Sequence, residues 1–305
     1  MKLELKDIRK SFGEKEILHG VSFAVESGRA LGLLGRNGAG KTTTIRIIMD
    51  VFHANSGEIM LDGEIFHPTA SQVGYLPEER GLYPKKKVRD QMVYLAMLRG
   101  MNKKQANEST VKWLDRLHVS EYIDRKLETL SKGNQQKVQL AATLVGEPQL
   151  VILDEPFSGL DPVNAQVLKD VIRELIREGR IVIFSSHQMS YVEEFCEDIA
   201  IINNGEIALS GDIADIKAEY GKNQLIISAV GMGAEELAEK LKTSCADTLS
   251  VTGIHKDGVI VKNIHELSGN ALIKEIMNAD IEIASFDSYR PSLNDIFVKA
   301  VGGDR

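Results

Sequence analysis

The sequence predicts an α/β protein in which a large layered domain is followed by a small α+β domain. Two observations carry this prediction. Over the first two-thirds of the chain, short apolar segments alternate with amphipathic segments of helical period. After residue 221 the expected order changes to β-α-β-β-α-β, which is typical of a ferredoxin-like fold. The 305 residues are enough for one large domain and one smaller one.

The first domain is expected to cover residues 1–221. A hairpin is predicted at 57–66 around Asp62-Gly63, and a mainly helical subdomain at about 88–130. A helix is predicted at 41–51, directly after the first buried strand. The predicted buried strands are 29–34, 150–153, 181–185 and 199–202, and the turn 203–205 leads into one more strand.

The second domain is expected to cover residues 222–305. A turn at Lys256-Asp257-Gly258 separates its two middle strands, and its last helix follows Pro291. Its predicted strands are 225–229, 249–254, 259–262 and 281–286, and its predicted helices include 234–242 and a segment that ends near 277. We therefore expect an accessory domain of about 80 residues after the larger one.

Composition limits the classes of function. The formal net charge of −7 argues against a protein that binds nucleic acid by broad phosphate neutralisation. No window reaches the roughly 18 consecutive apolar residues that a spanning helix needs. The first six residues are too charged to open a secretory signal. Any role in a membrane process would therefore be carried out from the cytosol, by docking onto a partner.

Residues 35–42, Gly-Arg-Asn-Gly-Ala-Gly-Lys-Thr, match the pattern G-x-x-x-x-G-K-[ST] of a P-loop. Glycines let backbone N–H groups curl toward phosphate oxygens, and the following helix adds its positive N-terminal end. Lys41 is expected to reach the β- and γ-phosphates, and the Thr42 hydroxyl to bind Mg²⁺. A chance glycine-rich turn is disfavoured because a strand precedes the motif and a helix follows it. The predicted nucleotide-binding residues here are Gly35, Asn37, Gly38, Gly40, Lys41, Thr42 and Thr43.

A pair of acids ends the predicted strand at 150–153. Asp154 suits a Mg²⁺ contact, and Glu155 is placed to orient or deprotonate the water that attacks the γ-phosphate. Two adjacent acids at a strand end are otherwise often only solvated. A P-loop enzyme needs an acid at the carboxyl edge of a neighbouring strand, so the catalytic interpretation is favoured.

Further motifs resemble the ATP-binding cassettes of ABC transporters, over residues 3 to about 220. Leu130-Ser131-Lys132-Gly133-Asn134 resembles the family's signature, and Ser158-Gly159-Leu160-Asp161 its D-loop. His187, after Phe184-Ser185-Ser186, resembles the switch histidine. Phe12 lies where the family has an aromatic residue that stacks on adenine. The resemblance implies a P-loop NTPase fold, ATP and Mg²⁺ as ligands, and ATP hydrolysis.

The family's mechanism also implies partners. Two such domains would close head to tail around two ATP molecules, so the chain would dimerise with itself or with a homologue. Ser131 and the Gly133 N–H would contact the γ-phosphate held by the other subunit, because the N-terminus of a helix favours an anion. Asp161 would lie at the dimer seam. His187 would hold the γ-phosphate and orient the attacking water.

Two departures from the family pattern occur. Lys132 and Asn134 replace the commonest signature residues, although Ser131 and Gly133 are intact. In Tyr75-Leu76-Pro77-Glu78-Glu79-Arg80, Glu78 occupies the place of the usual glutamine. Its carboxylate can bind Mg²⁺ or water but adds negative charge near the γ-phosphate, so we expect an altered metal dependence.

Residues 73–84 and the signature segment are similar to the bacterial NatA-type sodium-extrusion ATPases, as is the run 289–297 more loosely. This resemblance implies a separate ABC-2-type permease, export, and a peripheral location on the inner face of the cell membrane. Sodium is one candidate substrate beside drugs, peptides and lipids. The run Lys85-Lys86-Lys87 is either a solvated basic patch or a contact with the permease or with lipid headgroups.

Two other classes of function stay open. A soluble ABC ATPase acting on nucleic acid or ribosomes would usually carry two cassettes or long coiled-coil insertions, and neither is evident here. A regulator that binds ATP without hydrolysing it would have no chemical need for Glu155. The exporter subunit is the favoured interpretation.

Overall fold

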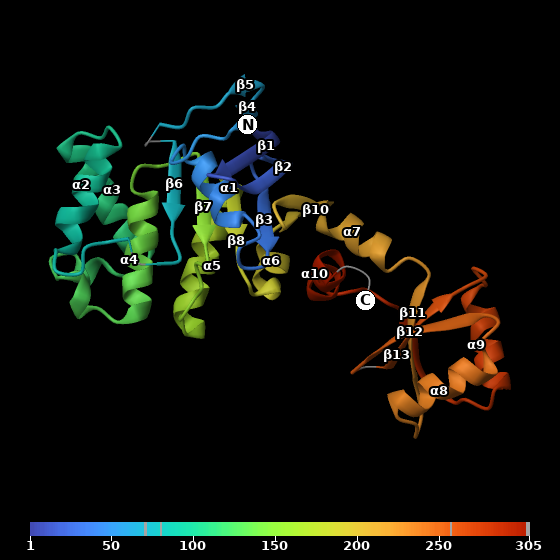
Figure 1. The fold of residues 1–305 in the computed structure, drawn as a ribbon. Helices are drawn as coiled ribbons and strands as arrows, with labels where there is room; N and C mark the ends of the chain where they lie inside the picture. Colours follow the sequence, from blue (N-terminus) through green and yellow to red (C-terminus); the bar gives the residue numbers. More distant parts are fainter. Residues whose placement is uncertain (70–71, 80, 257, 303–305) are drawn as a thin grey trace. The chain divides into compact units, whose positions relative to one another are not determined.

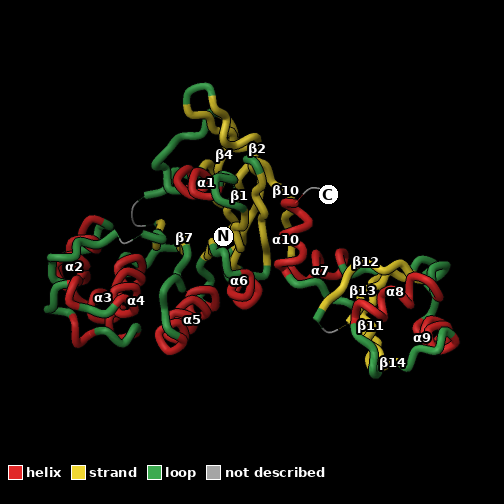
Figure 2. The backbone as a smooth tube through the Cα atoms, turned by 60° about the horizontal axis from the view of Figure 1, so that its bottom comes forward, coloured by secondary structure: helices red, strands yellow, loops and turns green. Residues whose placement is uncertain are grey.

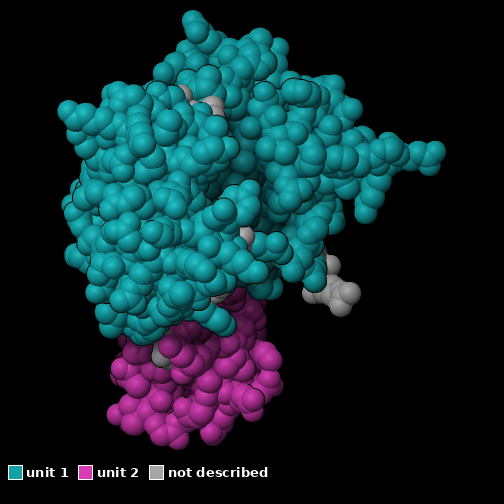
Figure 3. Space-filling view, turned by 90° about the vertical axis from the view of Figure 1, so that its left-hand side faces the viewer, with its two compact units in different colours: residues 1–213, 297–305 teal, residues 214–296 magenta. Residues whose placement is uncertain are grey.

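The computed structural model describes residues 1–69, 72–79, 81–256 and 258–302. The chain forms two compact units, residues 1–213 with 297–302, and residues 214–296, which Figure 3 shows in different colours. This division lies near the start of helix α7 (Ile213–Tyr220), whereas the boundary expected at residue 221 lies just after that helix.

The larger unit contains a six-stranded sheet of order β10-β9-β3-β8-β7-β6 (Figure 1). Neighbouring strands are parallel except β10, which pairs antiparallel with β9. The predicted buried strands are confirmed, because both faces of a parallel sheet are covered and its strands are nearly continuously apolar. The strands are β3 (Ala30–Gly35), β6 (Val73–Leu76), β7 (Leu150–Asp154), β8 (Ile181–Ser185), β9 (Asp198–Asn203) and β10 (Glu206–Asp212).

A second, antiparallel sheet of order β2-β1-β4-β5 lies beside the first. Its strands are β1 (Lys2–Phe12), β2 (Lys15–Glu26), β4 (Ser56–Leu61) and β5 (Glu64–Ile65). The pairing of β4 with β5 confirms the predicted hairpin. Strands β1 and β2 were not predicted from the sequence. Asp7 has a φ of 48°, and the register between the two strands shifts there, so the apolar alternation that marks a strand is interrupted.

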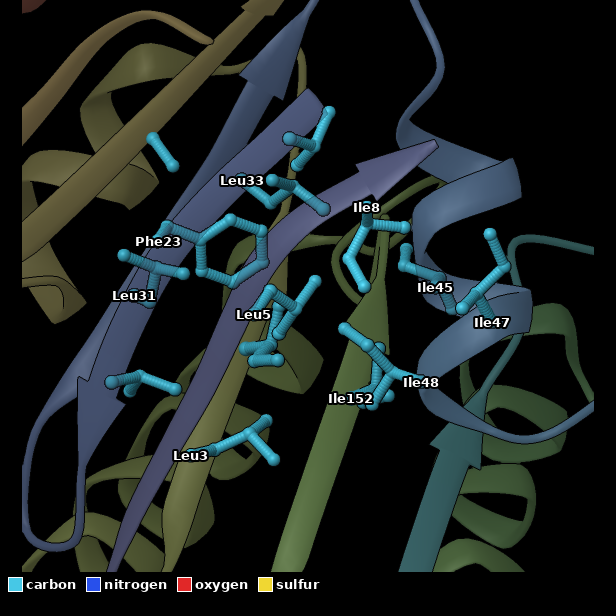
Figure 4. Packing of buried hydrophobic residues seen from close by; sticks show 14 of the residues in the cluster. Leu3, Leu5, Ile8, Phe23, Leu31, Leu33, Ile45, Ile47, Ile48 and Ile152 are labelled. Carbon is cyan, nitrogen blue, oxygen red and sulfur yellow. The ribbon is translucent and has the colours of Figure 1, made fainter. Parts of the chain in front are cut away.

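The main core lies between the two sheets and helix α1 (Lys41–Ile48) (Figure 4). Leu5 and Ile8 from β1 point toward Ile45 and Ile48 of the helix in this view. The helix is shorter than the expected 41–51. It ends before Asp50, whose φ of 56° is left-handed and closes the last turn.

Helices α2 (Val88–Leu98), α3 (Lys103–Arg116) and α4 (Lys132–Leu144) lie side by side and are called here the helical region (Figures 1 and 2). Short 3₁₀ turns at Ser120–Tyr122 and Leu127–Thr129 connect α3 to α4. The other helices of this unit include α5 (Pro162–Arg177) and α6 (Met189–Phe195). None of the helices in the described ranges has the length and hydrophobicity that a membrane span requires.

A group of polar contacts joins the helical region to the six-stranded sheet. Glu147 accepts hydrogen bonds from Lys112 Nζ at 2.8 Å, from Trp113 Nε1 at 3.2 Å and from an Arg180 guanidinium nitrogen at 2.7 Å. The cations of Lys112 and Arg180 also lie 5.1 and 5.9 Å from the centre of the Trp113 ring. The junction between α3 and the start of β8 is therefore held by charge as well as by packing.

The second unit has a four-stranded antiparallel sheet of order β12-β13-β11-β14. The predicted order β-α-β-β-α-β is confirmed. Ile227, Leu241 and Val261 lie in the hydrophobic core of this unit. The predicted turn at 256–258 includes residue 257, which lies outside the described residues. Its elements are β11 (Gln224–Ala229), α8 (Ala234–Ser244), β12 (Leu249–His255), β13 (Gly258–Asn263), α9 (Gly269–Asn278) and β14 (Ile283–Ser288). The last helix, α10 (Leu293–Gly302), belongs to this unit only as far as Ile296.

Candidate functional site

The chemically distinctive residues gather at the carboxyl ends of β3, β6, β7 and β8. Parallel pairing places Asp154 at the end of β7 opposite Ser185 at the end of β8. Such an edge is where ligands bind in open α/β sheets. A cavity of about 580 Å³, called here the central cavity, opens there. It is lined by Phe12, Lys15, Ile17, Arg36, Asn37, Gly38, Gly40, Lys41, Thr42, Thr43, Glu78, Asp154, Glu155, Ser185 and His187.

The loop between β3 and α1 forms one wall of the cavity. Gly38 and Gly40 have φ values of 79° and 117°, a backbone region that glycine adopts without strain. Gly40 precedes the first residue of α1, so the N-terminal end of that helix faces the cavity. Backbone N–H groups and a helix N-terminus together attract phosphate.

Lys41 provides the positive charge of this wall. Its Nζ donates to the carbonyl oxygens of Gly35 at 2.5 Å and Arg36 at 3.3 Å. Burial lowers the pKa of the Lys41 ammonium, although nearby carboxylates oppose the change. These carboxylates belong to Asp154, Glu155 and Glu78. The predicted phosphate-binding lysine and the predicted acids are therefore brought together.

Glu155 is 8% exposed and has a φ of 48°. Its carboxylate accepts hydrogen bonds from Ser186 Oγ at 3.0 Å and from the His187 backbone N–H at 2.5 Å. His187 Nε2 lies 3.8 Å from Glu155 Oε1. Burial raises the pKa of Glu155, while the hydrogen bonds from Ser186 and His187 oppose the rise. A carboxylate with a raised pKa is a better proton acceptor, which suits a general base.

The three predicted metal ligands, Thr42, Asp154 and Glu78, all line the central cavity. They offer a hydroxyl and two carboxylates, and oxygen donors of this kind fit Mg²⁺. Asp154 Oδ2 also accepts a hydrogen bond from the Tyr75 hydroxyl at 3.4 Å. Burial and the neighbouring Asp154 raise the pKa of Tyr75 to about 12. Tyr75 therefore stays protonated and can keep donating to Asp154.

Phe12, the last residue of β1, lines the cavity. Its side chain is 45% exposed, and its ring meets the edge of Phe52 at a centroid distance of 5.3 Å. Lys10 Nζ lies 5.2 Å from the ring centre. An exposed aromatic ring held in this way can stack on a purine.

Ser131, Gly133 and Asp161 are not among the described residues that line the cavity. Ser131 is the N-cap of α4, and its Oγ accepts from the Asn134 N–H at 3.3 Å. Asp161 is the N-cap of α5 and accepts from the N–H groups of Val163 and Asn164, both at 3.0 Å. The cap hydrogen bonds from Asn164 lower the pKa of Asp161. The predicted signature and D-loop residues are therefore placed apart from the phosphate-binding wall.

Two residues that bind the acids were not predicted from the sequence. Ser186 binds Glu155, and Tyr75 binds Asp154. Ser186 directly precedes His187 in the sequence. A hydroxyl beside the switch histidine could have indicated a hydrogen bond to the nearby acid. Tyr75 comes close to Asp154 only through the pairing of β6 with β7, which the sequence analysis did not predict.

Comparison with known proteins agrees with this geometry. A family model described as "ABC transporter" matches residues 18–158, and one described as "ATP-binding protein DrrA1-3-like, C-terminal domain" matches residues 211–301. An uncharacterized ABC transporter ATP-binding protein of Bacillus subtilis, YhaQ, is 38% identical over 98% of both chains. The linearmycin resistance ATP-binding protein LnrL of the same organism is 28% identical over 98% of both chains.

Among solved structures, an ATP-binding subunit of an ABC transporter matches with a TM-score of 0.67 and 28% identity. The match covers 79% of this chain and 100% of that one. It confirms the predicted P-loop NTPase fold. The chain therefore belongs to the ATP-binding proteins of ABC transporters, a family of ATPases.

Proposed function

We propose that this chain powers an exporter by closing head to tail with a second copy, or with a homologue, around two ATP molecules. One observation carries the proposal. None of the described residues that line the central cavity comes from the signature, Ser131 and Gly133, or from Asp161. One chain thus presents one half of an ATP site. The N-terminal end of α4 on another chain, where Ser131 and Lys132 are exposed, would supply the other half.

In the closed pair, four side chains of the cavity have distinct proposed roles. Lys41 binds the β- and γ-phosphates, and Phe12 stacks on adenine. Glu155 takes the proton of the attacking water, which His187 orients. Mg²⁺, when bound, neutralises charge on the phosphates.

Thr42, Asp154 and Glu78 would hold the metal ion. Their oxygen atoms face one cavity that also contains Lys41. Glu78 would add a negative charge that the usual glutamine lacks, so Mg²⁺ would be bound more tightly and the γ-phosphate less favourably.

A separate ABC-2-type permease is the proposed membrane partner. Lys85, Lys86 and Lys87 are exposed, and Tyr83 beside them is 70% exposed. Such a basic and aromatic surface suits an acidic segment of a permease better than a lipid headgroup alone, because aromatic residues are enriched where proteins dock. This partner would hold the chain at the inner face of the cell membrane.

The proposed direction of transport is export, and two substrates are considered. The NatA-like segments support sodium. LnrL is named for resistance to linearmycin and matches 98% of this chain, which supports export of an antibiotic or similar compound. Because the path through the membrane belongs to the permease, its identity decides between them.

The decisive experiment is a pull-down of tagged Glu155→Gln protein from detergent-solubilised host membranes with Mg-ATP. Recovery of a multi-spanning protein, identified by mass spectrometry, is the expected result. Recovery of ribosomal or DNA-bound proteins instead would favour a soluble ABC ATPase. Replacing Lys85, Lys86 and Lys87 by Glu should reduce the recovery of the permease while ATP binding is retained.

Dimer formation is tested on the same Glu155→Gln protein by light scattering with and without Mg-ATP. A mass that doubles only with Mg-ATP is expected. Lys41→Ala in the same background is the control, because it should not close. A monomer at saturating Mg-ATP, with the permease present in detergent, would contradict the proposed head-to-tail dimer.

A further inference from the structure

A buried glutamine of α4 donates hydrogen bonds to the loop that carries Glu78. Gln139 is 5% exposed, and its Nε2 donates to the carbonyl oxygens of Pro77 at 3.3 Å and Glu79 at 3.1 Å. These are the residues on either side of Glu78. One turn further along the helix, Thr143 Oγ1 donates to the Tyr75 carbonyl at 3.2 Å.

The same helix also holds the loop after the proposed general base. Gln136 Nε2 donates to the carbonyl oxygen of Pro156 at 3.1 Å, and Pro156 directly follows Glu155. Glutamine side chains of α4 therefore bind two loops of the central cavity. The helix begins at Lys132, directly after its N-cap Ser131.

These bonds hold the backbone on both sides of Glu78. The Glu78 side chain is exposed, so its position depends on its backbone rather than on surrounding packing. If the Gln139 side chain is removed, these two carbonyl groups lose their hydrogen-bond donor. They must then bind water or remain unpaired, which costs free energy. Without Gln139, the segment Pro77–Glu79 would no longer be tied to α4 at this point.

We propose that Gln139 is a positioning residue that holds Glu78 where it can bind Mg²⁺ in the central cavity. The position of Glu78 then depends on the position of α4. The proposal rests on the role of Glu78 in the proposed function. When Ser131 and Gly133 engage the γ-phosphate on the other chain, α4 is held in place. Gln139 then holds Glu78 in its own site, so each ATP site senses whether the other is closed.

The test compares Gln139→Met with Ser109→Ala. Methionine keeps the length of the side chain but lacks the donor. Ser109→Ala is the matched control, since its Oγ also makes a buried hydrogen bond within the helical region, to the Val145 carbonyl at 2.7 Å, away from Glu78. Both variants should lose similar thermal stability. Only Gln139→Met should lower kcat, by about five- to tenfold, with little change in the KM for ATP.

A second measurement does not depend on turnover. In the Glu155→Gln background, the Mg²⁺ concentration that gives half-maximal dimer formation with ATP is measured by light scattering. Gln139→Met should raise this concentration by roughly three- to tenfold, whereas Ser109→Ala should leave it unchanged. If Gln139→Met proves unstable, Gln139→Ala, whose smaller side chain avoids any clash, takes its place.

A double variant distinguishes the loss of Glu78 positioning from a general structural effect of the Gln139 substitution. In Glu78→Ala protein, Gln139→Met should have no further effect on kcat, because the group that it positions is absent. An undiminished further loss would overturn the proposal, as would a wild-type kcat and Mg²⁺ dependence for Gln139→Met. If Glu78→Ala alone behaves as wild type, the proposed role of Glu78 fails instead.

Discussion

Removing the Ser186 hydroxyl should move the pH dependence of ATP hydrolysis. Ser186 Oγ donates to the Glu155 carboxylate at 3.0 Å in a buried site, and this bond lowers the pKa of Glu155 against the effect of burial. In Ser186→Ala the opposing bond is lost, so the pKa of Glu155 rises further. The base must be ionised to accept a proton. As the pH is lowered, the activity of the variant should therefore begin to fall at a higher pH than that of the wild type.

The size of the effect follows from the contact. A hydrogen bond to a charged group contributes about 1.5–3 kcal/mol, and part of it is recovered when water takes the place of the hydroxyl. A net loss of about 1.4 kcal/mol corresponds to one pKa unit. The acid limb of kcat/KM should therefore move up by about one pH unit, while rates at alkaline pH stay close to those of the wild type.

The assay is phosphate release at subsaturating Mg-ATP over a range of pH. Ser185→Ala is the control, because Ser185 contacts the Glu155 N–H through its backbone carbonyl, at 2.9 Å, and this contact survives the substitution. Its acid limb should not move. An acid limb of Ser186→Ala that stays in place, or that moves to lower pH, would refute the assignment of Glu155 as the base.

Three further outcomes are expected. Lys41→Ala should weaken ATP binding by at least about tenfold in a fluorescence titration, and unchanged affinity would remove Lys41 from its role. Glu78→Gln should raise the Mg²⁺ concentration for half-maximal turnover by roughly threefold, since one carboxylate charge is lost; an unchanged Mg²⁺ requirement and turnover would contradict this. Gly133→Ala should lower stability by about 1 kcal/mol in thermal unfolding, because the new Cβ would lie 2.7 Å from Asn164 Nδ2 and displace an amide that binds Asp161. An unchanged melting temperature would show that Asn164 adapts without loss.

The phosphate-binding wall could be predicted from the sequence because its constraints are local. A glycine-rich turn followed by Lys41 and Thr42 needs only a strand before it and a helix after it. Asp154 and Glu155 are equally visible, since two acids end a run of buried apolar residues. The family resemblance then supplied the places of His187 and of the signature.

The remaining features depend on contacts between distant parts of the chain. Tyr75 and Gln139 reach the site only because β6 pairs with β7 and α4 packs against the following loop. No pattern near either residue indicates this. Strand β1 was missed for a local reason, because the left-handed residue Asp7 interrupts its alternation.

The junction around Trp113 gives the protein an internal optical reporter. The sequence contains one tryptophan, so its emission comes from a single position. The indole lies between α3 and the start of β8, beside two cations and hydrogen-bonded to a carboxylate. Emission from an indole responds to nearby charge, so a rotation of the helical region against the sheet would change the spectrum. A movement of this kind on nucleotide binding would therefore be visible in the emission of the unlabelled protein.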